Sequence, residues 1–307
     1  NYPYEINEAL ELDSVRRHLD AYFELTRSVD LVSYLTGDGW DPIVDFAGSI
    51  EGNLNEVQNI WITSGSDRVG LFGVIDGGSV SNLGLTIHSN GILGGQYVGG
   101  MVGELANNGT ISRCYVLEGT IATNVGGTAS RTGGFVGYIT SGSITESFTT
   151  ANVGGTSLAG SSIADRVGGF VGGIGALFGG ISDSYATGSV SGDADTGGFF
   201  GWSSGSADKA LINSVYSSGD VTTTDGTTSG IFAGNDFDTI GSGYYDTNAS
   251  LTGGNAGISI TNLTGVDFTT NGTNSASFPG LSTSTWAFGP SGISGSNGPV
   301  LQWEVGD

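Results

Sequence analysis

The sequence predicts an all-β protein, a right-handed parallel β-helix (β-solenoid) of about six three-stranded coils with a short N-terminal capping helix. Three observations support this. A Gly-rich segment recurs about every 32 residues. Each repeat holds three short β-prone runs, and no helix-period pattern lies between them. A β-propeller is the alternative, but its blades need four strands.

The first run of each repeat is a pair of apolar residues between two glycines, or between Gly and Ala in the last copy. Six copies occur, at 70–73, 100–103, 134–137, 169–172, 198–201 and 230–233. So many matches at similar spacing are far beyond chance. If each repeat forms one coil, equivalent runs of successive coils pair in parallel about 4.8 Å apart.

The second run opens with an aliphatic residue, and the third is shorter and centred on Ile or Val. Gly, Ser, Asn and Asp separate the runs, as expected of turns. Two residues after each opening aliphatic residue lies a polar position, occupied by Asn82, Arg113, Glu146, Asp183 and Ser214. We interpret this column as an exposed ladder at a coil corner, where Asn and Asp tolerate tight turns. A charged active surface is the alternative.

The two ends depart from the repeat. We expect an N-terminal cap over residues 1–66, with a short helix within 8–22, where apolar residues recur near helical spacing. The repeats cover 67–245. Residues 246–307 form a C-terminal cap that ends in an aromatic-rich segment. The three parts are expected to make one continuous, elongated domain.

An aromatic column is the strongest candidate binding site. It lies four residues after the opening aliphatic residue and consists of Tyr115, Phe148, Tyr185, Tyr216 and Tyr244. The alternate positions hold small residues, and strand side chains alternate between faces. We therefore expect small residues inside and the rings outside, as an exposed ligand-binding strip. The strip could bind a sugar chain, pack against another subunit or lie under a covering loop. The opposite orientation buries five rings.

The charge restricts the partners. The chain has 8 Lys and Arg against 30 Asp and Glu, a net charge of −22. A surface this acidic repels nucleic acid and anionic membranes, and no apolar stretch is long enough for membrane insertion. The same surface favours solubility and suits a salt-adapted protein, because salt screens self-repulsion.

Few residues suggest a cofactor. Two His and one Cys do not make a typical zinc site, and Cys114 falls in a small, apolar column that indicates a core position. Calcium is the one candidate, at two Asp-x-Asp loops, because such loops are rich in oxygen ligands. Its expected ligands are Asp193, Asp195, Asp236 and Asp238. A solvated acidic loop is the alternative.

The repeat resembles the GLUG motif. Residues 181–190, Ile-Ser-Asp-Ser-Tyr-Ala-Thr-Gly-Ser-Val, are the best copy, and 38–43, 46–53 and 298–303 are similar to the usual flanking segments. The resemblance covers about residues 4–303. It implies a solenoid of the kind found in filamentous-haemagglutinin-like surface adhesins and in the non-catalytic part of some IgA-specific metallopeptidases. It transfers no catalytic residue, and the zinc motif of those peptidases is absent.

These observations favour a non-enzymatic extracellular or cell-surface protein. It would serve in adhesion, or as a structural or receptor-binding module of a surface or fibre assembly. Its partner would be a glycan or a neighbouring subunit. A polysaccharide-active enzyme or carbohydrate-binding module on the same scaffold is the alternative, and a non-catalytic segment of a larger protease is a third reading.

Overall fold

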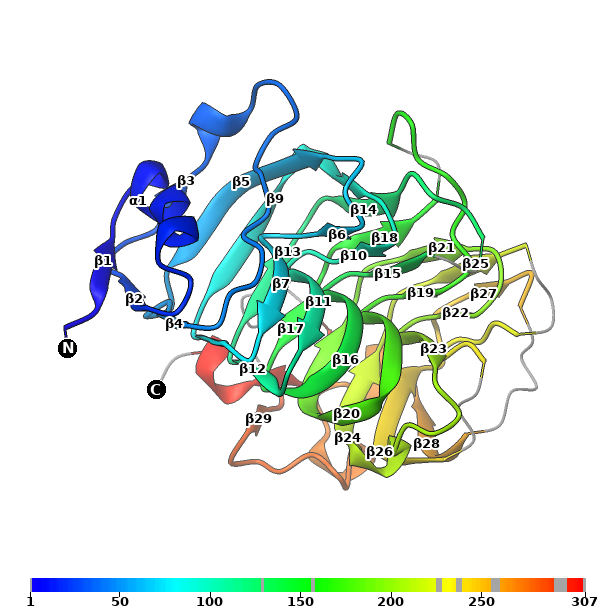
Figure 1. The fold of residues 1–307 in the computed structure, drawn as a ribbon. Helices are drawn as coiled ribbons and strands as arrows, with labels where there is room; N and C mark the ends of the chain where they lie inside the picture. Colours follow the sequence, from blue (N-terminus) through cyan, green and yellow to red (C-terminus); the bar gives the residue numbers. More distant parts are fainter. Residues whose placement is uncertain are drawn as a thin grey trace.

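The computed structural model describes residues 2–127, 130–155, 158–224, 228–235, 239–254, 260–289 and 297–305. These residues form a β-solenoid of about seven coils, which confirms the predicted fold class (Figure 1). Strands of successive coils pair in parallel throughout the solenoid. The antiparallel pair β29–β30 lies in the C-terminal segment.

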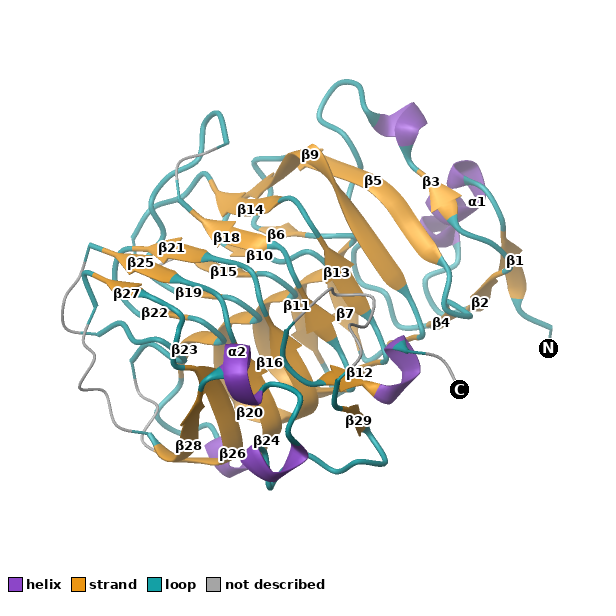
Figure 2. Cartoon of the chain, turned by 180° about the vertical axis from the view of Figure 1, so that it is seen from behind, coloured by secondary structure: helices purple, strands orange, loops and turns teal. Residues whose placement is uncertain are grey.

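Each central coil contributes to five parallel ladders rather than three. We number the ladders in chain order, and Figures 1 and 2 show them as adjacent stacks. Ladder 1 consists of β6 (Arg68–Val69), β10 (Tyr97–Val98), β15 (Arg131–Gly133), β19 (Val167–Gly168) and β22 (Thr196–Gly197). Ladder 2 consists of β7 (Phe72–Asp76), β11 (Val102–Ala106), the start of β16 (Val136–Thr145), the start of β20 (Val171–Ala186) and β23 (Phe200–Ser203).

Ladder 3 holds the opening aliphatic residues. It consists of β1 (Tyr4–Ile6), β2 (Tyr22–Leu25), β4 (Ser49–Glu51), β8 (Ser79–Ser81), β12 (Gly109–Ser112), later parts of β16 and β20, and the start of β24 (Ile212–Ser217). Ladder 4 carries the aromatic column. It consists of β3 (Val29–Asp30), the starts of β5 (Glu56–Thr63) and β9 (Gly84–Gly94), β13 (Tyr115–Leu117), β17 (Phe148–Thr149), the ends of β20 and β24, β26 (Thr239–Asp246) and β28 (Thr261–Val266).

Ladder 5 completes the coil. It consists of the ends of β5 and β9, β14 (Thr120–Thr123), β18 (Asn152–Gly154), β21 (Val190–Gly192), β25 (Val221–Thr223) and β27 (Leu251–Thr252). The helical turns are short. They are α1 (Ala9–Ser14), η1 (Val15–Arg17), η2 (Val32–Tyr34), η3 (Lys209–Leu211), α2 (Phe268–Asn271), η4 (Ser275–Ser277) and η5 (Gln302–Glu304).

The glycines of the repeat explain why the first predicted run splits into ladders 1 and 2. A Cβ added to Gly172 would lie 2.4 Å from the backbone nitrogen of Thr132, and one on Gly137 would lie 2.6 Å from that of Val98. Contacts this short are forbidden to a real Cβ. Only glycine lets ladder 2 fold back against ladder 1, so the motif is a steric requirement of this tight corner.

The polar column after the opening aliphatic residues lies at a coil corner, as predicted. Its backbone is left-handed, with φ of 52° at Asn82, 47° at Glu146 and 49° at Asp183. Asn and Asp adopt this conformation more readily than most residues. Arg113, at φ 53°, pays a larger steric cost. The corner divides the second predicted run between ladders 3 and 4.

The solenoid core contains one aliphatic side chain per coil from ladder 3 and stacked rings from the corner between ladders 1 and 2. Phe135 and Phe170 stack at 4.8 Å between centroids, as do Phe170 and Phe199. Cys114 is fully buried in this core, as its column predicted. Burial disfavours the thiolate and raises the pKa of Cys114 to about 12.

The N-terminal region carries the predicted helix, and it also contributes coils of its own. Leu12 of α1 and Val15 of η1 are buried against the solenoid core. Strand β4 pairs with β8, with Ile50 opposite Val80, so ladder 3 crosses the expected boundary at residue 66 without a break. This continuation is why the solenoid has about seven coils rather than six.

The C-terminal segment differs from the expected end cap. After β28 it turns back along the side of the solenoid, and η5 returns to the neighbourhood of β12 (Figure 1). Phe278 contacts Tyr244, whereas the later Trp303 contacts Phe148 and Tyr115. The segment therefore runs opposite to the direction of coil stacking. We call residues 266–304 the C-terminal cover, leaving out 290–296, which lie outside the described residues.

Candidate functional site

The aromatic column points away from the solenoid core, but it is not exposed. Tyr185, Tyr216 and Phe148 are 0% exposed, and Tyr115 and Tyr244 are 3% exposed. The small alternate residues, such as Cys114 and Ala186, lie in the main core as expected. The expectation of an exposed ligand-binding strip is therefore wrong. The side-chain direction was right, but the C-terminal cover buries all five rings.

Stacking and hydrogen bonds fix the buried column. Consecutive ring centroids lie 4.8 Å apart from Phe148 to Tyr185 and 4.7 Å apart from Tyr185 to Tyr216. Each tyrosine hydroxyl has a partner, as buried hydroxyls require. Tyr115 donates to Glu56 at 2.9 Å, Tyr185 to Glu304 at 2.7 Å and Tyr216 to the Pro299 carbonyl at 2.7 Å, and Tyr244 accepts from the Gly280 amide at 2.7 Å.

The candidate calcium loops have other partners where they are described. The Asp193 carboxylate accepts a hydrogen bond from the Thr224 hydroxyl, and Asp195 lies 3.7 Å from Arg166 as an ion pair. Asp236 and Asp238 lie outside the described residues. Within the described ranges, no group of three or more His, Cys, Asp or Glu side chains could hold a metal ion. Calcium binding stays a prediction.

The polar corner column does not gather into a single charged surface. Arg113 and Glu146 are 3.9 Å apart and partly exposed. Asp183 accepts a hydrogen bond at 2.9 Å from the indole of Trp286, which belongs to the C-terminal cover. This column therefore helps to anchor the cover rather than forming an acid–base site.

A different surface brings chemically distinctive residues together, at the corner between ladders 1 and 2. We call it the arginine–aromatic strip. It consists of Arg68, Tyr97 and Arg131 from ladder 1, of Arg166 directly before β19, and of Glu104, Tyr138 and Trp202 from ladder 2. Three of the chain's eight basic residues lie in it.

The fold produces this strip directly. Outward residues of ladder 1 and ladder 2 face each other because the glycine corner brings the two ladders together. The guanidinium of Arg131 lies 4.5 Å from the Tyr138 ring centroid, 5.2 Å from that of Tyr97 and 5.2 Å from that of Trp202. Arg166 lies 4.4 Å from the Trp202 ring. These are cation–π distances.

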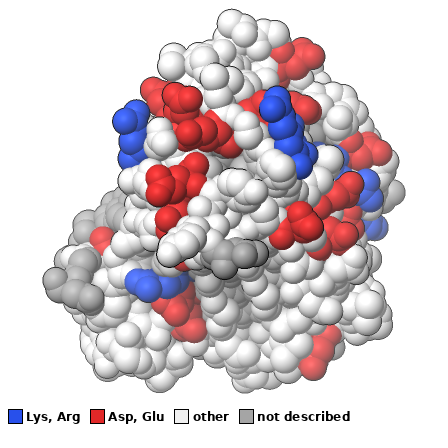
Figure 3. Space-filling model, turned by 60° about the vertical axis from the view of Figure 1, so that its left-hand side comes forward, with Lys and Arg blue, Asp and Glu red and all other residues white. Residues whose placement is uncertain are grey.

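Acidic side chains compensate two of the arginines. Glu104 pairs with Arg68 and also accepts from the Thr140 hydroxyl at 2.6 Å. The hydrogen bond to Glu104 raises the pKa of Arg68 above its ordinary value. Asp195 pairs with Arg166. On the face drawn in Figure 3, acidic side chains are widely spread and basic side chains lie next to them.

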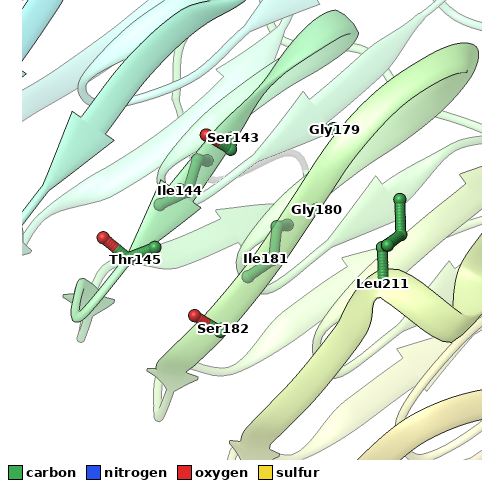
Figure 4. Close-up of a pocket in the computed structure, with 8 residues that line it drawn as sticks. All are labelled: Ser143, Ile144, Thr145, Gly179, Gly180, Ile181, Ser182 and Leu211. Atoms are coloured by element: carbon green, nitrogen blue, oxygen red, sulfur yellow. The ribbon is translucent and has the colours of Figure 1, made fainter.

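Two surface depressions of the described residues differ in their chemistry. One, of about 420 Å³, lies at its N-terminal end and is lined by Val44, Asp45, Ser66, Asp67, Arg68 and Val74. The other, of about 150 Å³, lies between β16 and β20 beside Leu211 (Figure 4). Its lining is Ser143, Ile144, Thr145, Gly179, Gly180, Ile181, Ser182 and Leu211, without an ionisable side chain. The first depression extends the strip, and the second offers little chemistry.

Comparisons with known proteins agree with the fold and give little on function. No family model matches the chain. An Evansella cellulosilytica protein, provisionally named a Gly-rich membrane protein, is 40% identical over 94 residues, which are 27% of this chain and 11% of that protein. Halomucin of Haloquadratum walsbyi is 33% identical over 129 residues, 38% of this chain and 1% of halomucin. The chain thus spans a small part of each relative.

A solved structure matches nearly the whole chain. It is a Bacteroides ovatus protein provisionally named an immunoglobulin A1 protease, with a TM-score of 0.69 over 98% of this chain and 92% of that one. At 20% identity the likeness shows the fold alone. The two sequence relatives have names typical of surface proteins. No helix in the described ranges is long and apolar enough to cross a membrane.

Sequence reasoning missed the strip, although a signal was present. Three arginines occupy equivalent positions in their repeats, each two residues before a glycine. They are Arg68 before Gly70, Arg131 before Gly133 and Arg166 before Gly168. Tyr97 and Asp195 occupy the same column in the other coils. Alignment of this column would have placed the arginines in one ladder. The facing rings of ladder 2 follow only from the corner geometry.

Proposed function

We propose that this chain is a non-enzymatic extracellular module of a larger surface protein, of the GLUG-repeat kind, and that it contacts a carbohydrate through the arginine–aromatic strip. The observation that carries the proposal is the row of half-buried rings of Tyr97, Tyr138 and Trp202, held beside arginines on a rigid surface. Half-buried aromatic rings beside polar side chains in fixed positions are suited to contacting sugar rings.

The rigidity of the strip supports binding rather than catalysis. Its side chains come from paired strands, so little conformational entropy is lost when a ligand orders them. The two carboxylates, Glu104 and Asp195, each pair with an arginine. The surface-type names of the relatives, and the small fraction of their length that this chain spans, fit a repeated module in adhesion or in a structural assembly.

A glycan array tests the proposal. Wild-type protein is compared with Trp202→Ala and Tyr138→Ala, and with Tyr2→Ala as the matched control, because Tyr2 is 98% exposed at the N-terminal end. We expect binding to at least one glycan class, a loss of ~10-fold or more in the strip variants and no change in the control. Wild-type binding that survives both strip substitutions would contradict the proposal.

A further inference from the structure

Arg131 differs from the other two arginines of the strip because no described carboxylate forms an ion pair with it. Arg68 and Arg166 each have a carboxylate partner. Among the described residues, no hydrogen bond or ion pair is formed by the Arg131 guanidinium, and its Nε is buried without a partner. A buried donor without an acceptor costs free energy. The cation–π contacts with Tyr97, Tyr138 and Trp202 stabilise the charge, but they leave the hydrogen-bonding capacity of the guanidinium unused by described residues.

The surroundings hold Arg131 in one orientation. Gly173 stands opposite Tyr138 and Trp202 in ladder 2, where a larger side chain would occupy the space. A Cβ on Gly173 would lie 2.9 Å from Arg131 Cδ and 3.3 Å from its Nε. The missing side chain thus leaves a slot between the two rings, and the stem of Arg131 fills it.

The Arg131 side chain is partly exposed rather than fully buried. The terminal nitrogens of Arg131 are not among the buried unpartnered atoms, and they form no hydrogen bond with described residues. Burial lowers the pKa of Arg131, and the neighbouring Arg166 lowers it further, while Tyr97 and Glu104 oppose this. An arginine stays protonated at neutral pH even so. It presents a fixed fork of N–H donors, the geometry that matches a carboxylate in two parallel hydrogen bonds.

We infer that Arg131 binds the carboxylate of an acidic saccharide, so that the strip recognises uronic-acid-containing glycans. This inference rests on the proposed function and narrows its ligand class. The carboxylate would pair with the terminal nitrogens of Arg131, while the flanking rings of Tyr138 and Trp202 contact the sugar. An isolated anion would use only the fork. A sugar acid uses the fork and the rings, and the strip offers both.

The net charge of the protein opposes the binding of an acidic ligand. An acidic glycan approaching a surface of net charge −22 is repelled at long range. Binding therefore depends on short-range pairing at Arg131, which is poorly screened because the site is partly buried. We expect the affinity for the acidic ligand to be maintained or increased when salt screens the long-range repulsion.

The test compares one sugar backbone with and without its charge. The probes are a tetragalacturonate and its fully methyl-esterified form, which differ only in the carboxylates. Wild-type protein is compared with Arg131→Gln and Arg131→Lys, and Arg17→Gln is the matched control because Arg17 is exposed in η1. Titration calorimetry gives the dissociation constants, and thermal melting verifies that each variant is folded.

We expect wild type and Arg17→Gln to bind the acid ~10-fold or more tightly than the ester. Arg131→Gln should lose that preference, and Arg131→Lys should keep part of it as a point charge without the fork. Equal binding of acid and ester by wild type, or a preference that persists in Arg131→Gln, overturns the inference and leaves the proposed function standing. Should Arg131→Gln fail to fold, a full preference in Arg131→Lys overturns the assignment of the fork. No binding of any glycan overturns both.

Discussion

Replacement of Tyr185 by alanine tests whether the aromatic column is a second core. Tyr185 is 0% exposed, its ring stacks on both neighbouring rings, and its hydroxyl donates to Glu304 at 2.7 Å. Truncation of a buried aromatic side chain costs about 3–5 kcal/mol of unfolding free energy. An exposed ring on the same strand would cost within about 0.5 kcal/mol. The expected loss of unfolding free energy is therefore several-fold larger for a buried Tyr185 than for an exposed one.

Tyr185→Phe separates packing from hydrogen bonding. It keeps the stacked ring and removes the donor to Glu304, itself a buried carboxylate. Hydrogen bonds to charged groups contribute about 1.5–3 kcal/mol. We therefore expect Tyr185→Phe to destabilise by about 2 kcal/mol, and Tyr185→Ala to exceed it because packing is lost as well.

Urea unfolding followed by tryptophan fluorescence and far-UV circular dichroism measures both variants, with Tyr2→Ala as the control. A solenoid can unfold in stages, so limited proteolysis of the C-terminal cover is measured in parallel. We expect earlier cleavage of the cover in Tyr185→Ala. A change within about 0.5 kcal/mol, with unaltered proteolysis, would refute the assignment of the column to a buried interface.

Four further outcomes follow from the structure. Gly172→Ala should lower the free energy of unfolding by about 3 kcal/mol, because the new Cβ meets backbone atoms. Gly65→Ala, with open space around it, should change the free energy of unfolding by less than about 0.5 kcal/mol. Urea unfolding midpoints measure the difference. Cys114, whose pKa burial raises to about 12, should resist alkylation at pH 8 until the protein is denatured, and fast labelling of native protein would contradict its core position. Hydrogen bonds from Thr269, Asn248 and Thr270 lower the pKa of Asp267 in the folded protein. The carboxylate therefore stabilises the fold above the pKa that it has in the unfolded chain, and this stabilisation is lost as pH falls below about 4. Asp267→Asn should weaken that acid dependence, as measured by proteolysis of the cover. Thermal stability should rise in molar salt if the charge of −22 is an adaptation to salt, and an unchanged or lower melting temperature would refute that reading.

Much of the fold was predictable because the repeat encodes steric requirements. The glycines stand where a Cβ would strike backbone, so their spacing marks the corners of the coil. The aliphatic positions recur because each coil needs one side chain at the same place in the core. The number of strands in each coil was harder to predict. Single left-handed residues such as Asp183 divide a continuous β-prone run. The polar column predicted a corner at these residues, but one residue per coil does not reveal that the run pairs as two separate ladders.

The candidate site was less predictable because it depends on contacts between ladders. The direction of the aromatic column followed from the small residues that alternate with it, which fit the narrow interior. Its burial did not follow, because the covering residues, such as Phe278 and Trp286, are distant in the chain and carry no repeat. The arginine–aromatic strip likewise joins positions seven residues apart, such as Arg131 and Tyr138, that meet only across the glycine corner.

The repeat pattern was enough to predict the solenoid, the coil length, the side-chain direction of the aromatic column and the buried cysteine. Each depends on short-range sterics and on alternation along a strand, and both are local properties. The tertiary structure decided which outward surfaces stay accessible. The C-terminal cover buries the tyrosines, while the corner between ladders 1 and 2 leaves Arg131 partly exposed. Accessibility is a property of the whole chain, because any surface can be covered by a segment far away in sequence.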